Sequence, residues 1–293
     1  MVGLAAEAVQ CKERSEADGL AQSGDFFKGY SCFFRAKKPS PALKFGFPAD
    51  GIALFYRHSR FSASPAPSGH CFASMDGQPA AQGFVTALLH DKQSGRSLLV
   101  AATHLKAKAG VDNEQTRVHQ ACQLLQELEN VQERQQVLQL QQQPPAGSSN
   151  GASSSRGVPP AVLLCGDFNT TPDSETVQVI AAAAAAAAGG DDSSSSSSSS
   201  SPVPAQEGDE FTTWKFRSTG AVKRTIDYIW YSEQQLAPTS RWLMLSELEI
   251  GPEGLPSKQY PSDHMSWVDK FQPGWYLGLR AWQKAGGTQT FDA

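Results

Sequence analysis

Carboxylate and amide side chains stand directly after an apolar run in the middle of the chain. Asp167 and Asn169 follow the run 161–166 in the sequence Gly-Asp-Phe-Asn, so both polar groups emerge where a buried strand would end. Such a pair can hold a metal ion or orient a water molecule, and it can hydrogen-bond a phosphoryl oxygen, as metal-assisted hydrolysis requires. The alternative is an Asx turn that ends a strand.

An aspartate and two histidines occupy similar positions elsewhere. Asp227 interrupts the apolar sequence Thr-Ile-Asp-Tyr-Ile-Trp, and a buried carboxylate is costly unless it is paired. His264, which follows Asp263 in Pro-Ser-Asp-His, is a natural partner, because an Asp–His hydrogen bond fixes the imidazole tautomer and prepares the ring for proton chemistry or phosphate contact. His104 ends another strand-like run. Taken singly, each of these residues is more often a structural polar group.

The charge balance and the cysteines exclude some classes of protein. The 293 residues carry a formal net charge of −4, which argues against a protein that coats nucleic acid but allows a local basic pocket. The 5 cysteines are widely spaced, so neither a disulfide framework nor a zinc site is indicated. No apolar run approaches the roughly 20 residues that a membrane span requires. We expect a soluble monomer in a reducing compartment, the cytoplasm.

Hydrophobic periodicity predicts the elements that must position these side chains. Short β-type runs at 51–56, 83–90 and 97–104 have the pattern of consecutive antiparallel strands. Apolar residues at helical spacing predict one long helix over 112–140, with Asp112 or Asn113 as its N-cap. Further strands are expected at 161–166, 224–231, 240–246 and 264–271.

The chain has the pattern of one catalytic domain that is interrupted by low-complexity sequence. Residues 1–25 form a poorly defined leader, 26–272 the domain and 273–293 a C-terminal tail. Two insertions, at about 141–160 and 181–208, lack the apolar residues that would offset the entropy of ordering them. We expect the second insertion to be disordered and removable without loss of folding.

Four motifs together resemble a known superfamily. Thr-His-Leu, Gly-Asp-Phe-Asn, Asp-Tyr and Ser-Asp-His occur in the order that the endonuclease/exonuclease/phosphatase superfamily shows. Within it, the phrases FFRAKKPSP, DGIALFY, THLKAK, FTTWKFR, RTIDYIWYS and LPSKQYPSDHMS are similar to the nocturnin-like group and its relatives, the carbon-catabolite-repressor-type deadenylases. The resemblance runs from about residue 30 to residue 271. It implies a four-layer α/β-sandwich, in which two packed mixed sheets are flanked by helices.

The resemblance also implies roles for the motif residues. Asp167 would position or activate the attacking water, and Asn169 would contact the scissile phosphate. His264 would stabilise the phosphoryl transition state while Asp227 holds its ring, and His104 would bind a phosphate oxygen from the opposite side. The activity implied is that of a metal-dependent phosphohydrolase.

The implied cofactor is magnesium, with manganese as an alternative, and Asp167 and Asp263 are the expected ligands. The family pattern opens with two strands, the second of which ends in a glutamate that binds the metal. We find neither strand, so we expect a domain whose first strands and main metal ligand are missing. A catalytically inactive binding module, or a fragment, is therefore the alternative to an enzyme, and a targeting peptide upstream of the domain stays open.

Basic residues fall where nocturnin-like proteins line a pocket for additional phosphates of the substrate. These residues are Lys37, Lys38, Lys106, Lys108 and Arg217. The implied reaction is either removal of the 2′-phosphate of NADP(H) or 3′-to-5′ removal of adenosines from poly(A) RNA. The sequence shows no obvious track of aromatic residues for stacked bases.

Overall fold

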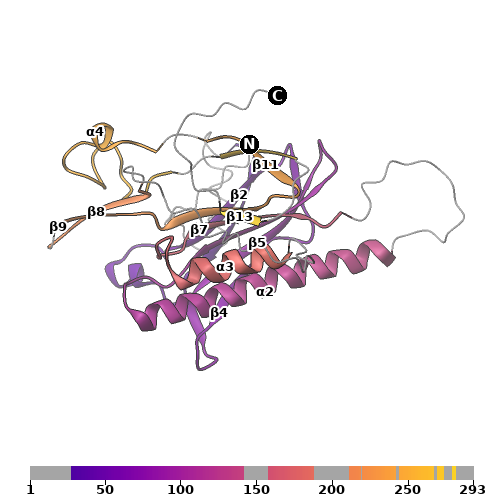
Figure 1. The fold of residues 1–293 in the computed structure, drawn as a ribbon, viewed down its shortest axis with the longest axis horizontal. Helices are drawn as coiled ribbons and strands as arrows, with labels where there is room; N and C mark the ends of the chain where they lie inside the picture. The colour runs from indigo at the N-terminus through magenta and orange to yellow at the C-terminus, as the bar shows by residue number, and fades with distance from the viewer. Residues whose placement is uncertain are drawn as a thin grey trace, which may run out of the picture.

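Figure 1 presents the protein as a computed structural model. The structure describes the residues in the ranges 28–141, 158–187, 211–218, 220–241, 244–266, 269–273 and 279–281. The expected leader over 1–25 lies outside the described residues, and so do most of the two expected low-complexity insertions.

A mixed sheet of seven strands forms the centre of the molecule (Figure 1). Its strands are β3 (Phe61–Ala63), β4 (Ser68–Ala73), β5 (Pro79–Asp91), β6 (Ser97–His104), β7 (Ala161–Asp167), β10 (Asp227–Ser232) and β13 (Leu279–Ala281). The strand order is β13-β10-β7-β6-β5-β3, and β4 pairs with β5. β6 and β7 are parallel, whereas the other pairs are antiparallel. These two central strands are apolar almost throughout because both of their faces are covered.

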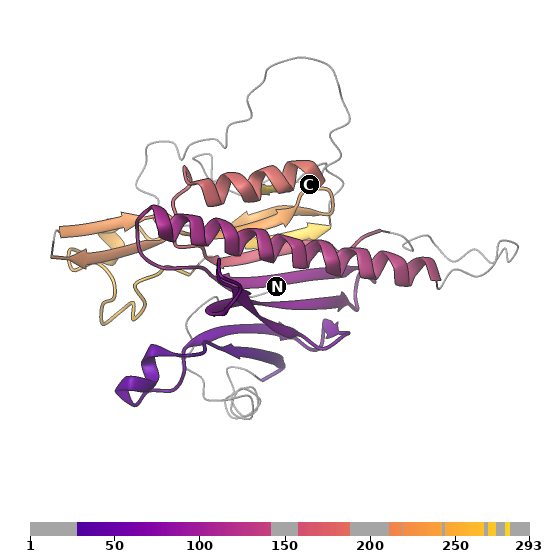
Figure 2. The same cartoon turned by 90° about the horizontal axis from the view of Figure 1, so that it is seen from below.

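Two helices lie side by side on one face of this sheet (Figure 2): α2 (Val111–Gln141) and α3 (Glu175–Ala187). Leu124 of α2 and Ile180 of α3 pack with residues of the sheet in one buried cluster. The long helix expected over 112–140 is thus confirmed. The N-cap prediction was wrong, because the helix already includes Val111 and Asp112 lies within its first turn.

Helix α3 also corrects the expected start of the second insertion. The helix continues to Ala187, and its residue Ala184 is buried. Alanine is the strongest helix former, and its small side chain lets α3 pack closely on α2 and the sheet. Residues 181–187 therefore belong to the packed fold, so a deletion that begins at residue 181 would remove part of the core.

A second layer of strands covers the other face of the central sheet. It contains two antiparallel pairs, β1 (Tyr30–Ala36) with β2 (Gly51–Arg57) and β11 (Leu236–Arg241) with β12 (Asp269–Pro273). Leu54 of β2 and Phe271 of β12 pack into the same cluster, against Val100 and Leu163 of the central sheet. The strand at 51–56 is confirmed, but it pairs with β1 rather than with the strand at 83–90.

The remaining elements lie beside the central sheet. They are the 3-10 turn η2 (Pro41–Phe45), the hairpin strands β8 (Thr213–Arg217) and β9 (Gly220–Arg224), and the short helix α4 (Glu247–Ile250). In both views, the η2 loop and the β8–β9 hairpin project at the end of the molecule where α2 begins (Figures 1 and 2). None of the described helices is long and apolar enough to cross a membrane.

Three expected strands of the second half, and the expected tail, were wrong in their bounds. The strand expected at 224–231 is divided between β9 and β10, and β11 ends at Arg241 where a strand was expected to begin. In the run 264–271, His264 forms one isolated bridge with Thr213, and β12 begins only at Asp269. The expected tail supplies β13, which pairs with β10. The α/β-sandwich class itself is confirmed, and the described residues form one helix layer and two strand layers.

Candidate active site

Strand register brings His104, Asp167 and Asp227 into one row. His104 and Asp167 are partners in the parallel pairing of β6 with β7, and Asp227 is the partner of Asp167 in the antiparallel pairing of β7 with β10. His104 Nε2 lies 3.5 Å from Asp167 Oδ2. Three residues that are distant in the sequence therefore lie side by side at one end of three neighbouring strands, β6, β7 and β10.

Gly166 allows β7 to lie close to β6 at this end of the sheet. Its φ of +148° lies in the region that favours glycine, and a Cβ atom at this position would lie 1.9 Å from the carbonyl oxygen of Thr103. A side chain would thus force β7 away from β6 one residue before Asp167. The glycine of the Gly-Asp-Phe-Asn motif is explained by this close backbone approach.

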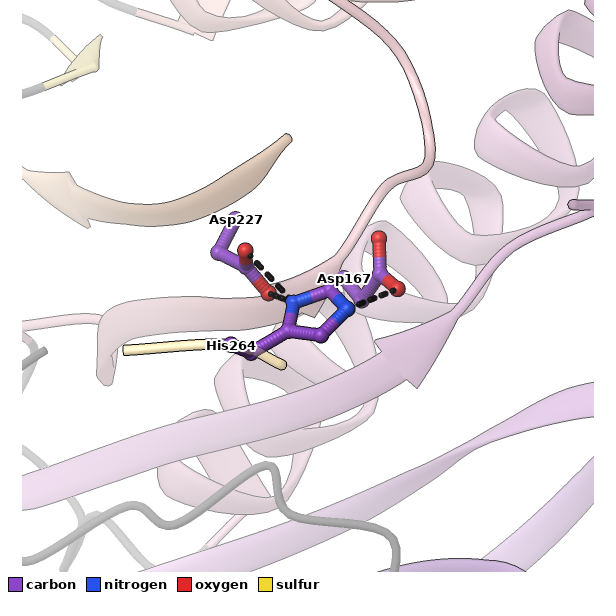
Figure 3. A group of neighbouring side chains, drawn as sticks. All are labelled: Asp167, Asp227 and His264. Atoms are coloured by element: carbon purple, nitrogen blue, oxygen red, sulfur yellow. Dashed lines mark hydrogen bonds and ion pairs between the residues drawn. The ribbon is translucent and has the colours of Figure 1, made fainter. Parts of the chain in front are cut away.

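His264 lies between two carboxylates (Figure 3). Its Nδ1 is 2.9 Å from Asp227 Oδ2, and its Nε2 is 3.7 Å from Asp167 Oδ2. The loop that carries His264 is held against β8, because Met265 N donates to the carbonyl of Thr212. The hydrogen bond to Asp227 directs Nε2 toward Asp167, which is the ring orientation that proton chemistry or phosphate binding needs.

The surroundings oppose the charge on Asp167 and favour the charge on His264. Burial, followed by the negative charge of Asp227, raises the pKa of Asp167 to about 7. Burial alone would lower the pKa of His264, but the hydrogen bond and charge of Asp227 and then the charge of Asp167 raise it above its ordinary value. A carboxylate whose pKa is raised, beside an imidazole whose pKa is also raised, is suited to move a proton.

Lys215 is a member of this site that the sequence analysis missed. Its Nζ lies 3.3 Å from His264 Nε2 and 2.7 Å from Asp263 Oδ2. Burial alone would raise the pKa of Asp263, but this hydrogen bond and charge lower it below its ordinary value. Lys215 points to the same side of β8 as Arg217, because side chains alternate along a strand. The alternation Lys-Phe-Arg was the signal that could have indicated it.

Asn169 and His104 complete the group of motif residues. The backbone N–H of Asn169 donates to Asp167 Oδ1 at 2.8 Å, and its side chain donates to the carbonyl of Leu105 at 3.2 Å. Burial by surrounding protein atoms, followed by the charge of Lys37, lowers the pKa of His104 to about 4. The side chain of His104 is nevertheless 47% exposed, so water screens part of this lowering of the pKa. His104 is therefore a neutral imidazole at physiological pH.

The expected phosphate-binding residues lie on three different segments. Lys37 follows β1, pairs with Asp50 at 3.7 Å and is close enough to His104 to lower its pKa. Lys38, the residue after Lys37, is exposed. Arg217 is exposed at the end of β8. Lys106 and Lys108 belong to the loop between β6 and α2, and Lys108 is exposed.

Asp167 is the carboxylate that best fits a divalent cation. Ligand atoms of Asp167, Asp227 and His264 lie within 4.8 Å of one another. Asp227 is already hydrogen-bonded to His264, and the expected ligand Asp263 is paired with Lys215. Burial, followed by the negative charge of Asp227, disfavours the charged form of Asp167, and a cation would favour that form. Magnesium is commonly bound through one or two carboxylates together with water and substrate phosphates, and Asp167 suits that mode.

Comparisons with known proteins identify the family. The model of the Endonuclease/Exonuclease/phosphatase family matches residues 13–264, and this chain belongs to that family. Enzymes of this family depend on divalent metal ions, and the family and its relatives point to a hydrolase of the phosphatase or nuclease kind.

Similar curated proteins and solved structures narrow the group. Rat nocturnin is 34% identical over 83% of this chain and 49% of its own length, and human nocturnin is 33% identical over the same shares. The chain thus spans about half the length of these relatives. The human nocturnin catalytic domain with bound sulfate is 29% identical at a TM-score of 0.57, over 84% of this chain and 73% of that chain. ANGEL2, a 2′,3′-cyclic phosphatase in complex with adenosine-2′,3′-vanadate, shares the fold at 21% identity and a TM-score of 0.60, over 89% of this chain and 80% of that chain.

Proposed function

We propose that the chain is a magnesium-dependent phosphohydrolase that removes the 2′-phosphate of NADP(H). The observation that carries this proposal is the position of the His264 imidazole between Asp227 and Asp167 at the end of the sheet. A carboxylate that can accept a proton from water thus lies beside a cationic ring that can contact a phosphoryl oxygen. The nocturnin relatives support the same class of reaction.

Each side chain has one task in this proposal. Asp167 accepts the proton of the attacking water, and Asn169 donates from its amide to the scissile phosphate. His264 donates from Nε2 to the phosphoryl oxygen on which negative charge develops, while Asp227 fixes the ring. His104 is neutral and contacts a phosphate oxygen from the other side of Asp167. A bound magnesium ion would supply further charge stabilisation of the phosphoryl oxygens.

Lys215 strengthens the anion-binding side of the same site. Its Nζ is within 3.3 Å of His264 Nε2, so both groups can reach one phosphoryl oxygen. When a phosphate binds, Lys215 can donate to it while it still holds Asp263. Two cationic donors that converge on one oxygen stabilise developing charge better than either donor alone.

The basic residues favour a substrate with more than one phosphate. Lys106 and Lys108 follow β6, whereas Arg217 comes from the β8–β9 hairpin, so phosphates can be held from two elements. This arrangement suits a dinucleotide that carries a diphosphate in addition to the phosphate that is removed. It is the reason for the choice of NADP(H).

A second candidate is the 3′-to-5′ removal of adenosines from poly(A) RNA. Phe45 and Phe47 are 76% and 55% exposed on the loop that begins at Lys37. Exposed aromatic rings beside basic residues are suited to stack successive bases. These two rings supply stacking surfaces that the sequence analysis did not find.

Parallel assays of the purified chain with Mg²⁺ test the proposal. Phosphate release from NADPH is measured beside adenosine release from poly(A), and the binding of adenosine 2′,5′-bisphosphate is measured by calorimetry. Asp167→Asn should lower turnover by at least about 100-fold with binding largely kept. Lys108→Ala should weaken binding by about 1.5–3 kcal/mol through the loss of one charge-assisted contact.

The exposed Asp76→Asn variant, in the turn between β4 and β5, is the matched control for Asp167→Asn and should change neither quantity. Tight binding of the bisphosphate without release of phosphate or adenosine would contradict the enzyme. That outcome would instead favour the alternative class, a non-catalytic binding module.

A further inference from the structure

An ion pair between the buried Arg117 and the half-buried Glu114, in the first turns of α2, connects the two loops that carry the candidate site. Arg117 Nη2 lies 2.6 Å from Glu114 Oε2, and the side chain of Arg117 is 5% exposed. The two residues project from α2 behind the site and do not belong to the group around His264. We refer to this pair as the Glu114–Arg117 clamp.

Arg117 holds the loop between β6 and α2. Its Nη1 donates to the carbonyl of Lys106 at 2.9 Å and to the carbonyl of Lys108 at 2.8 Å. The backbone N–H of Lys106 donates to Gln120 Oε1, so the next turn of α2 holds the same loop. The backbone positions of both lysines are thereby fixed by α2.

Glu114 holds the loop that follows β7. Its Oε2 accepts from Thr170 Oγ1 at 2.9 Å, and its Oε1 accepts from the backbone N–H and the hydroxyl of Thr176 at 2.9 and 2.7 Å. Thr170 is the residue after Asn169, and Thr176 is in the first turn of α3. Hydrogen bonds from Thr176, Arg117 and Thr170 outweigh burial and lower the pKa of Glu114, so it is a carboxylate at neutral pH.

Backbone strain is found at the two loops that the clamp joins. Within the described residues, the non-glycine residues with positive φ are Lys108 at +82° and Asn169 at +53°. Such conformations cost free energy and persist only where the surroundings hold them. The carbonyl of Lys108 is bonded to Arg117, and Asn169 is followed by Thr170, which is bonded to Glu114.

We propose that Glu114 and Arg117 are positioning residues that couple the lysine loop, 105–110, to the loop of Asp167 and Asn169, 168–174. This clamp fixes the position of the groups that bind the additional phosphates relative to the groups that act on the scissile phosphate. The consequence for catalysis rests on the proposed function. The structural coupling of the two loops does not depend on the proposed function.

Arginine is needed in the clamp because of its planar, five-donor side chain. Nε and Nη2 are directed to Glu114, while Nη1 serves two carbonyls. Lysine keeps the charge but cannot donate along these two directions at once. Arg117→Lys is therefore a mild variant that keeps the buried charge paired, whereas Glu114→Ala would leave Arg117 buried without its carboxylate and risk unfolding.

The matched control is a second ion pair on the same helix. Arg134 Nη2 lies 2.7 Å from Glu127 Oε1, and the side chain of Arg134 is 60% exposed. Arg134→Lys makes the same chemical change far from both loops. It should leave every quantity below unchanged.

Amide hydrogen exchange of the full chain tests the coupling without any ligand. Arg117→Lys should speed exchange in 168–174, the loop that Glu114 links to Arg117 through Thr170. Thr170→Val should likewise speed exchange in 105–110. Acceleration confined to the loop next to each substitution would overturn the proposal, whether or not the protein hydrolyses NADPH.

Kinetics of the same variants test the consequence for catalysis. Arg117→Lys should raise KM for NADPH and the Kd for adenosine 2′,5′-bisphosphate about fivefold or more, and Thr170→Val should lower kcat about fivefold or more. In the double variant, the loss in kcat/KM should be smaller than the product of the two single losses by about threefold. The two effects overlap because each single substitution already disrupts the same clamp. Variants that lower only the melting temperature, or losses that multiply fully, would show a merely structural pair.

Discussion

Asp167 of β7 is the cross-strand partner of Asp227 of β10, so the structure places two carboxylates opposite each other at the end of the sheet. The His264 ring contacts both carboxylates, with Asp227 at 2.9 Å from Nδ1 and Asp167 at 3.7 Å from Nε2. This asymmetry gives the two aspartates different tasks. Asp227 is committed to the ring, and Asp167 remains available to water, to a cation or to substrate.

Replacing Asp227 by Asn should lower the pKa values of both His264 and Asp167. Asp227 raises the pKa of His264 through its hydrogen bond and charge, and it raises that of Asp167 through its charge. The stabilisation from the Asp227–His264 pair is present below pH 6.5, the ordinary pKa of histidine, and is lost as the pH rises through the raised pKa of His264. We expect Asp227→Asn to cost about 1.5–3 kcal/mol of unfolding free energy at pH 6 and less at pH 9.

NMR titration of the His264 ring and urea unfolding at the two pH values check this. A cost that is equal at pH 6 and pH 9 would contradict the charge-assisted bond. The exposed Asp76→Asn variant, which carries the same change in formal charge, should show neither effect.

Replacing Lys215 by Met should move the acid limb of the activity profile to higher pH. Burial and Asp227 raise the pKa of Asp167, whereas Lys215 opposes them, so its removal raises the pKa of Asp167 above about 7. A proton-accepting Asp167 must be ionised, and turnover at pH 6–7 should therefore fall more than turnover at pH 9. Profiles of kcat/KM against pH measure the shift.

Lys223→Met provides the control for this variant, since Lys223 of the neighbouring strand β9 pairs with Glu247 of α4 rather than with the site. An acid limb that stays in place in Lys215→Met would argue that Asp167 does not act as the proton acceptor.

His104 should titrate near pH 4 in the folded protein. Its folded pKa is lowered below the ordinary value of 6.5, so it takes up its proton later than the unfolded chain as the pH falls. Stability is therefore lost between about pH 6.5 and pH 4, and a His104→Gln variant should show a flatter decline across this window. Lys37→Met should move the NMR midpoint of His104 upward, whereas Lys38→Met should leave it unchanged. A midpoint near 6.5 in the unmodified chain would contradict the lowered pKa of His104.

Replacing Gly166 by Ala should destabilise the fold and displace Asp167. The new Cβ atom would collide with the backbone oxygen of Thr103, which is part of the sheet and cannot move aside. Overpacking of this kind typically costs about 1–3 kcal/mol, and the unfavourable φ adds a further amount of similar size.

Gly77→Ala separates the two contributions. Gly77 also has a positive φ, at +80°, but nothing lies within 4 Å of its added Cβ. Urea unfolding should show a clearly smaller loss for Gly77→Ala than for Gly166→Ala. Equal losses would mean that the close approach of β6 and β7 is not the reason for the glycine.

Local patterns in the sequence were sufficient to predict the central elements. β6 was predicted with its observed bounds, and β7 and α2 were predicted to within one residue at each end, because long apolar runs and helical periodicity reflect burial directly. The motifs also indicated the residues around His264, since a charge inside an apolar strand requires a partner. The elements at 224–246 and 264–271 were less well predicted, because short strands depend on pairing with distant segments and leave a weak local pattern.

Tertiary structure alone decided how these residues meet. The sequence contains Asp167, Asp227 and His264 as separate motifs, but strand register sets the first two opposite each other, and the bridge from His264 to Thr213 brings the ring between them. No motif assigned roles to Lys215, although it stands in the phrase FTTWKFR, or to the Glu114–Arg117 clamp. Their roles arise from contacts between segments that are distant along the chain. The sequence determines which chemical groups are available, whereas the distances and burial that set their pKa values exist only once the sheet has formed.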